Sequence, residues 1–124
     1  MIYEDLKNKY ENIEKYCTES GDWEDIAVEA FKEKDYRVAI ENFEKVIVAI
    51  PDHYNGYEMC SYSLYEDNQK EKAIIYLEEG IKVAKSFDGE AKLPEDMIED
   101  MEKSLAAMKE EKELDKKYIE EIME

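Results

Sequence analysis

Two stretches of the chain, residues 23–51 and 57–85, carry the same pattern of apolar residues 34 positions apart. Large and small side chains follow one another in the same order in both. The matched positions are Trp23, Ile26, Ala27, Ala39, Ile40, Phe43 and Ile47 in the first stretch and Tyr57, Cys60, Ser61, Ala73, Ile74, Leu77 and Ile81 in the second. A repeat of this length indicates pairs of helices that bury their apolar faces against the next pair. The pattern therefore predicts an all-α fold built as a stack of helix pairs.

The boundaries of these helices can be predicted from the residues that interrupt the pattern. Apolar residues at helical spacing indicate an N-terminal helix over about residues 2–18. The first pair is expected over about residues 20–53, where Pro51 stops the second helix because proline has no amide hydrogen. The second pair is expected over about residues 54–87. Because these elements account for nearly the whole chain, we expect a single domain, residues 1–124.

The last part of the chain is predicted to be one long helix over about residues 94–122. Pro94 suits the first position of a helix, and neither proline nor glycine follows it. An apolar stripe on this helix would cover the exposed face of the second pair, as the end of a stack requires. The residues of the stripe are Ile98, Met101, Leu105 and Met108. Beyond the stripe, residues 109–117 are rich in charge, so the end of the helix is expected either to be solvated, which the charge favours, or to contact another chain.

The chain is strongly acidic, with 34 Asp and Glu residues against 17 Lys and Arg residues and a formal net charge of −17. Such a charge repels nucleic-acid phosphates and anionic membrane surfaces, so neither is expected as a partner. It favours basic peptides or proteins as ligands. An acidic surface also serves solubility alone, and this simpler interpretation stays open.

The two cysteines, Cys17 and Cys60, have neither the spacing of metal ligands nor a CxxC arrangement. Both fall at apolar positions of predicted helices, which favours buried, reduced thiols over a disulfide. Residues 1–10 are polar and amphipathic, and they contain no apolar run long enough for a signal sequence or a membrane span. We therefore predict a cytoplasmic protein.

The repeated pattern resembles that of the tetratricopeptide repeat (TPR) family. The residues that carry the resemblance are Trp23, Ile26, Ala27, Tyr36, Ala39, Phe43 and Pro51 in the first unit and, by residue class, Tyr57, Cys60, Ser61, Leu64, Ala73, Leu77 and Gly80 in the second. The chain departs from the pattern at Ala30, where the family prefers a large aromatic residue, and at Lys85, which replaces the closing proline. The resemblance covers about residues 20–87. It implies a TPR-type helix-turn-helix solenoid of two repeats, flanked here by an N-terminal helix and a long C-terminal capping helix.

In this family the first helix of each repeat lines a concave face, and the resemblance implies a groove for a partner there. The positions that it implies are Glu24, Asp25, Val28, Phe31 and Lys32 in the first unit and Asn55, Glu58, Met59, Tyr62, Tyr65 and Glu66 in the second. This set is acidic and rich in tyrosine, which suits a peptide that presents Lys or Arg between apolar residues. In the alternative, a third helix fills part of the groove, and Phe31, Tyr62 and Tyr65 are ordinary core residues.

Some members of the family clamp a partner's terminal carboxylate with Lys, Arg and Asn on the same face. The corresponding positions here hold Glu24, Asp25, Val28 and Met59, so no carboxylate clamp is expected. A structural or capping role, rather than catalysis, is expected for His53, the single histidine, which lies in the turn between the two units. The sequence contains no phosphate-binding glycine loop, no pattern of nucleophile and base, and no metal-ligand spacing. We therefore predict no catalytic residue, no metal and no cofactor.

These features together predict a non-enzymatic module for protein–protein interaction, a TPR adaptor or scaffold that binds a protein or peptide in its concave groove. Two alternatives stay open. In the first, the C-terminal helix or an open edge of the repeats pairs with another copy of the chain. In the second, the chain is a subunit of an assembly whose activity lies elsewhere.

Overall fold

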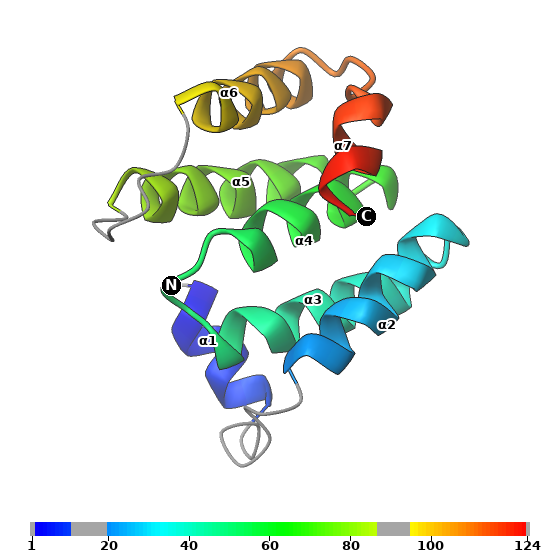
Figure 1. The fold of residues 1–124 in the computed structure, drawn as a ribbon, viewed down its shortest axis with the longest axis vertical. Helices are drawn as coiled ribbons and strands as arrows, with labels where there is room; N and C mark the ends of the chain where they lie inside the picture. Colours follow the sequence, from blue (N-terminus) through cyan, green and yellow to red (C-terminus); the bar gives the residue numbers. More distant parts are fainter. Residues whose placement is uncertain (1, 11–19, 87–94, 124) are drawn as a thin grey trace.

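The structure is a computed structural model that describes residues 2–10, 20–86 and 95–123, and in these parts of the chain it is built from helices and their connections alone (Figure 1). The helices are α1 (Ile2–Lys9), α2 (Ser20–Lys32), α3 (Tyr36–Ala49), α4 (Asn55–Glu66), α5 (Lys70–Lys85), α6 (Glu95–Lys109) and α7 (Lys116–Ile122). The predicted all-α class is therefore confirmed. Within the described parts, no helix combines the length and the apolar character needed to cross a lipid bilayer.

The helices pack mainly against their neighbours in the sequence. α2 packs on α3 and α4 packs on α5, which gives two hairpins within the predicted first and second units. α3 also packs on α4 and α5 on α6, so the hairpins form a stack that α6 closes at one end (Figure 1). α1 lies against α3 at the other end. The predicted extension of the first helix to residue 18, with Cys17, and the predicted start at Pro94 lie outside the described residues.

Close approach between the helices depends on small residues at the crossings. Ala39 and Ala73 are completely buried, as the predicted alternation of small and large residues requires. Gly56 of α4 allows a close approach to α3, because a Cβ atom built there would lie 2.9 Å from Cγ1 of Ile47, and Gly80 of α5 allows a similar approach to α4, 3.0 Å from Cβ of Tyr57. Cys60 is a buried free thiol, which agrees with its predicted role as a small core residue. The sizes of these side chains therefore set how closely the two hairpins can pack.

Three helices end in the same way, with a non-glycine residue in the left-handed region. The φ angle is 64° at Lys34 after α2, 63° at Asn68 after α4 and 58° at Glu111 after α6. In each turn the following amide donates to a carbonyl five residues earlier, which satisfies the open end of the helix. These bonds are Asp35 N to Ala30 O, Gln69 N to Leu64 O and Lys112 N to Ala107 O. The turns after α2 and α4 thus follow the 34-residue period, and α6 ends like a third helix of the same kind.

The C-terminal region differs from the single helix predicted over about residues 94–122. α6 ends at Lys109, and the turn through Glu111 leads to a separate short helix, α7. Asp115 begins α7, because its side chain accepts a hydrogen bond of 3.2 Å from the amide of Tyr118. Leu114, just before this cap, is buried and fixes the connection to the core. The chain therefore turns here without a proline or a glycine, although the prediction of one continuous helix rested on the absence of both residues.

Candidate partner-binding site

The face predicted to bind a partner is formed by α2 and α4, and α7 covers part of it. Figure 1 shows α7 beside α4, between α6 and α2. A hydrogen bond from Tyr118 of α7 to Glu58 of α4 fixes this position, and Ile122 and Met123 line a hollow together with α2. This arrangement agrees with the alternative prediction, in which a third helix fills part of the groove. It divides the predicted residues into a closed half and an open half.

The closed half consists of the central residues of α4. Glu58, Met59 and Tyr62 are all buried, with 1% of Glu58 and 0% of Tyr62 exposed. Tyr62 belongs to the main core cluster, as the alternative interpretation predicts. Glu58 and Tyr62, which Tyr118 of α7 contacts, are therefore closed to a partner while α7 is in place.

Glu58 is the polar centre of the closed half. Its Oε2 atom accepts a hydrogen bond of 2.6 Å from the Tyr62 hydroxyl and one of 2.5 Å from the Tyr118 hydroxyl. The Tyr62 hydroxyl also lies 3.2 Å from Oγ of Ser104 on α6, and the rings of Tyr62 and Tyr118 meet edge to face. Two helices, α4 and α7, therefore donate to one carboxylate, and α6 joins the cluster through the Tyr62 hydroxyl.

The environment of Glu58 opposes its negative charge. Burial raises the pKa of the carboxyl group above its usual value, and the nearby Asp100 raises it further, while the hydrogen bonds from Tyr118 and Tyr62 act in the opposite direction. Burial and the charge of Glu58 likewise raise the pKa of Tyr62 and of Tyr118, so both hydroxyls stay protonated as donors. Among the described residues, no Lys or Arg forms an ion pair with Glu58.

The open half consists of the exposed side of α2 and its border with α7. Asp25 is exposed, while Glu24, Val28 and Phe31 are half-buried. A hollow of about 340 Å³ lies here, and three carboxylates, one lysine and three apolar residues line it. Its lining residues are Glu24, Asp25, Val28, Glu29, Lys32, Ile122 and Met123. The predicted combination of carboxylates and apolar contact area is therefore accessible at this end of the face.

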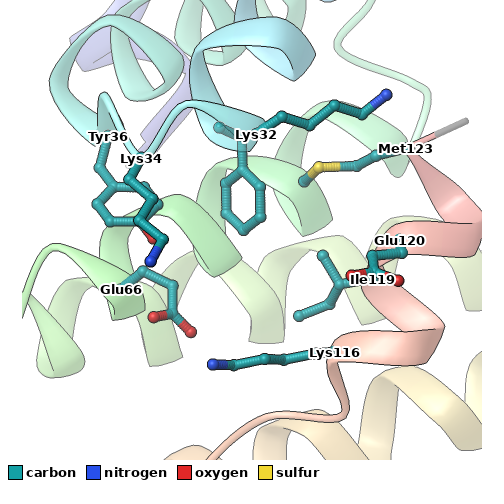
Figure 2. Close-up of a pocket in the computed structure, with 9 residues that line it drawn as sticks. Lys32, Lys34, Tyr36, Glu66, Lys116, Ile119, Glu120 and Met123 are labelled. Atoms are coloured by element: carbon teal, nitrogen blue, oxygen red, sulfur yellow. The ribbon is translucent and has the colours of Figure 1, made fainter.

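A second hollow, of about 230 Å³, lies between α7 and the ends of α2 and α4 (Figure 2). Figure 2 shows Ile119 and Met123 directed toward this space from α7, with Tyr36 and Glu66 on the opposite side. Phe31 completes the apolar wall, and its ring meets that of Tyr36 at a centroid distance of 5.5 Å. α7 therefore covers the face without filling it.

The remaining predicted residues lie at the two ends of α4. The Tyr65 hydroxyl donates a hydrogen bond of 2.5 Å to the carbonyl of Lys112, and neighbouring Lys70 forms an ion pair of 2.7 Å with Glu111. These two contacts hold the connection between α6 and α7 against the end of α4. At the other end, the amide of Asn55 donates to Nδ1 of His53, which agrees with the capping role expected for this histidine.

Sequence reasoning missed a second buried carboxylate, Glu44 on α3. It accepts hydrogen bonds from the hydroxyls of Tyr10 at 2.9 Å and Tyr76 at 3.5 Å, and Lys9 forms an ion pair with it at 3.1 Å. The one visible signal is the number of tyrosines, ten in 124 residues. Four of these ten bind Glu44 or Glu58.

Among the described residues, no group of three or more His, Cys, Asp or Glu side chains is placed to hold a metal ion. Every buried polar side-chain atom in these parts of the chain has a hydrogen-bond partner, so none is left to bind a ligand inside the core. Comparison with protein families, with curated proteins and with solved structures finds no match to this chain.

Proposed function

We propose that the chain is a TPR-type adaptor domain that binds a protein or peptide on its concave face. Two observations support the TPR assignment. The hairpins α2–α3 and α4–α5 pack in sequence, and both the apolar residues and the left-handed turns at Lys34 and Asn68 recur with an offset of 34 residues. Such stacks use their concave surface for binding.

One observation carries the functional part of the proposal, the acidic hollow between α2 and α7. Glu24, Asp25 and Glu29 line it against a single cation, Lys32, and Val28 and the end of α7 add apolar contact area. A peptide with Lys or Arg beside an apolar residue would complement both features, and the overall charge of −17 would speed its approach. The partner that fits best is therefore a basic, partly apolar segment of another protein.

A library of displayed peptides, panned against the whole chain, tests this proposal. We expect the selected peptides to contain Lys or Arg next to an apolar residue. Their binding should weaken by about tenfold or more when two of the three carboxylates of the hollow are replaced by lysine in Glu24→Lys/Asp25→Lys. Fluorescence anisotropy with labelled peptides measures the loss.

The matched control is Glu71→Lys/Glu99→Lys, which changes the net charge by the same amount at exposed positions on α5 and α6. The control should bind the peptides almost as tightly as the unchanged chain. Equal losses in both variants would show that only the overall charge matters, and the absence of any selected peptide would contradict the proposed function.

A second candidate function is self-association, and the placement of α7 is the observation that favours it. α7 is joined to α6 through an exposed connection, residues 110–113, and could pack on the concave face of another copy in the same way. Light scattering after size exclusion at high protein concentration tests this alternative. A dimer that dissociates when Ile119 is changed to Asp would support it, and a monomer at every concentration would remove it.

A further inference from the structure

α7 has the properties of a peptide bound to the concave face. It is a helix of 7 residues, too short to be stable alone in water. Its inner side is apolar, with Ile119 and Met123 buried, while Lys116, Lys117, Glu120 and Glu121 are exposed. The surface on which it lies therefore supplies most of its stability.

At the centre of the contact between α7 and α4, both helices present polar groups. Tyr118 donates to Glu58, which is also bound by Tyr62, so a carboxylate and two hydroxyl groups occupy the middle of this interface. A permanent core contact is usually apolar, because burying a carboxylate is unfavourable. When α7 leaves, water can solvate Glu58 and Tyr62, so the exposed surface remains compatible with solvent.

The connection that holds α7 in place is weakly attached. Its ion pair between Lys70 and Glu111 lies in solvent, where such pairs contribute little to stability. The hydrogen bond from Tyr65 to the carbonyl of Lys112 is exposed as well. Local opening of a short terminal helix under these conditions requires much less free energy than global unfolding.

α7 also leaves space that a longer segment could use. The hollow of about 230 Å³ beside Ile119 is walled by Phe31, Tyr36 and Met123, and the acidic hollow at the border with α2 continues the same face. A helix that extends beyond α7 at either end would therefore bury apolar surface that α7 leaves open.

We propose that α7 is an internal ligand of the concave face, and that the partner is a short amphipathic helix that replaces it and presents a hydrogen-bond donor to Glu58 in the position of Tyr118. This inference rests on the proposed function, since it assigns the closed half of the same face. α7 and the partner would then compete, and binding would be limited by the fraction of chains in which α7 is displaced.

A peptide of residues 113–124 of this chain, added to the whole protein, tests the inference without an identified partner. In Ile119→Asp, a charge at a buried position of α7 should release the helix and open the face. We expect the peptide to shift the amide resonances of Glu58 and Tyr62 in this variant in a saturable way. In the unchanged chain the tethered α7, at an effective concentration in the mM range, should prevent the same shift at sub-millimolar peptide.

The matched control peptide carries Tyr118→Phe, which keeps the ring and removes the donor. It should bind the Ile119→Asp chain several-fold more weakly, and equal binding would overturn the role of the donor. No shift in a folded Ile119→Asp chain, or the same shift in the unchanged chain, would overturn the role of α7. Unaltered amide resonances in α3 and α5 establish that the variant is folded.

A second variant keeps the test informative if Ile119→Asp does not fold. Tyr65→Phe/Lys70→Ala removes both contacts of the connection and leaves the surface under α7 intact. It should bind the peptide more tightly than the unchanged chain does, and equal affinities would overturn the inference.

The two proposals fail separately. Peptides selected from the library that still respond to Glu24→Lys/Asp25→Lys, together with an α7 peptide that never binds, would leave the proposed function standing and remove the internal ligand. Selected peptides that bind Ile119→Asp more tightly than the unchanged chain would support the internal ligand, and their weaker binding to Glu24→Lys/Asp25→Lys would support the proposed function.

Discussion

The two ends of the chain are attached to the stack by the same kind of contact. At the N-terminal end, the hydroxyl of Tyr10, which follows α1, binds the buried carboxylate of Glu44 together with Tyr76. At the C-terminal end, Tyr118 of α7 binds the buried carboxylate of Glu58 together with Tyr62. In both clusters a carboxylate on a helix of the stack accepts from one tyrosine of the stack and one tyrosine of the flanking segment.

The difference between the clusters lies in the charge that compensates each carboxylate. Lys9 forms an ion pair with Glu44, whereas no ion pair reaches Glu58 within the described residues. A buried charge that has only neutral donors is less well stabilised than one with a cation nearby. We therefore expect the contact with Glu44 to hold α1 more firmly than the contact with Glu58 holds α7.

The largest expected effect concerns the scaffold on which both clusters depend. Ala39→Leu and Ala73→Leu place large side chains at completely buried crossings, and each should lower the free energy of unfolding by about 1–3 kcal/mol. Ala106→Leu, at an exposed alanine of α6, is the control and should change stability by less than about 0.5 kcal/mol. Urea denaturation measures the difference, and an equal effect at all three positions would contradict the packing described.

The next effect separates the two carboxylates. Glu44→Gln removes the charge that Lys9 and two tyrosines stabilise, and it should lower the free energy of unfolding at neutral pH by about 1–2 kcal/mol, since Lys9 is more than half exposed and contributes little. Glu58→Gln removes a charge that has no cation and should leave stability unchanged or raise it. Urea titrations that give the same sign for both changes would break the comparison.

A smaller effect tests which flanking segment each tyrosine holds. Tyr118→Phe and Tyr10→Phe each remove one hydrogen bond and should cost about 0.5–1.5 kcal/mol. Amide hydrogen exchange should become faster in α7 alone for the first change and in α1 alone for the second. Faster exchange in both helices in either variant would show that the clusters are not independent.

The smallest expected effect is a pH dependence that belongs to Glu58. Burial raises the pKa of Glu58 in the folded state, so folding favours the protonated carboxyl group. The stability that this preference contributes is complete below the usual pKa of 4.5 and is lost as the pH rises through the higher folded pKa. The melting temperature of Glu58→Gln relative to the unchanged chain should therefore increase as the pH rises above 4.5. A relative melting temperature that falls over this range would contradict the assignment of Glu58 as a carboxylate destabilised by burial.

The sequence predicted the stack well where local and tertiary signals agree. Both hairpins follow from the 34-residue offset, and α3 ends at Ala49, shortly before Pro51, the residue predicted to stop it. The small residues Ala39, Ala73 and Gly80 lie at the predicted crossings because their size determines how closely the helices can approach.

The prediction was less complete where contacts between distant residues decide the structure. The turn at Glu111 contains no glycine or proline, and it is held by Lys70, 41 residues before Glu111, and by Tyr65, 47 residues before Lys112. The sequence did contain one signal for the start of α7, namely Asp115, because aspartate is a common N-cap residue. Glu44 and Glu58 fall among apolar residues in the sequence, and nothing local distinguishes them from the many exposed glutamates of the chain.

The central claim, that α7 occupies the concave face above Glu58, can be measured most directly by nuclear Overhauser effects between aromatic rings. The rings of Tyr118 and Tyr62 lie edge to face with their centroids 6.4 Å apart, although their residues are far apart in the sequence. We predict cross-peaks between the two rings in the unchanged chain, and their loss in Ile119→Asp. A well-folded chain that lacks these cross-peaks, with the Tyr62 ring accessible to solvent, would contradict the account.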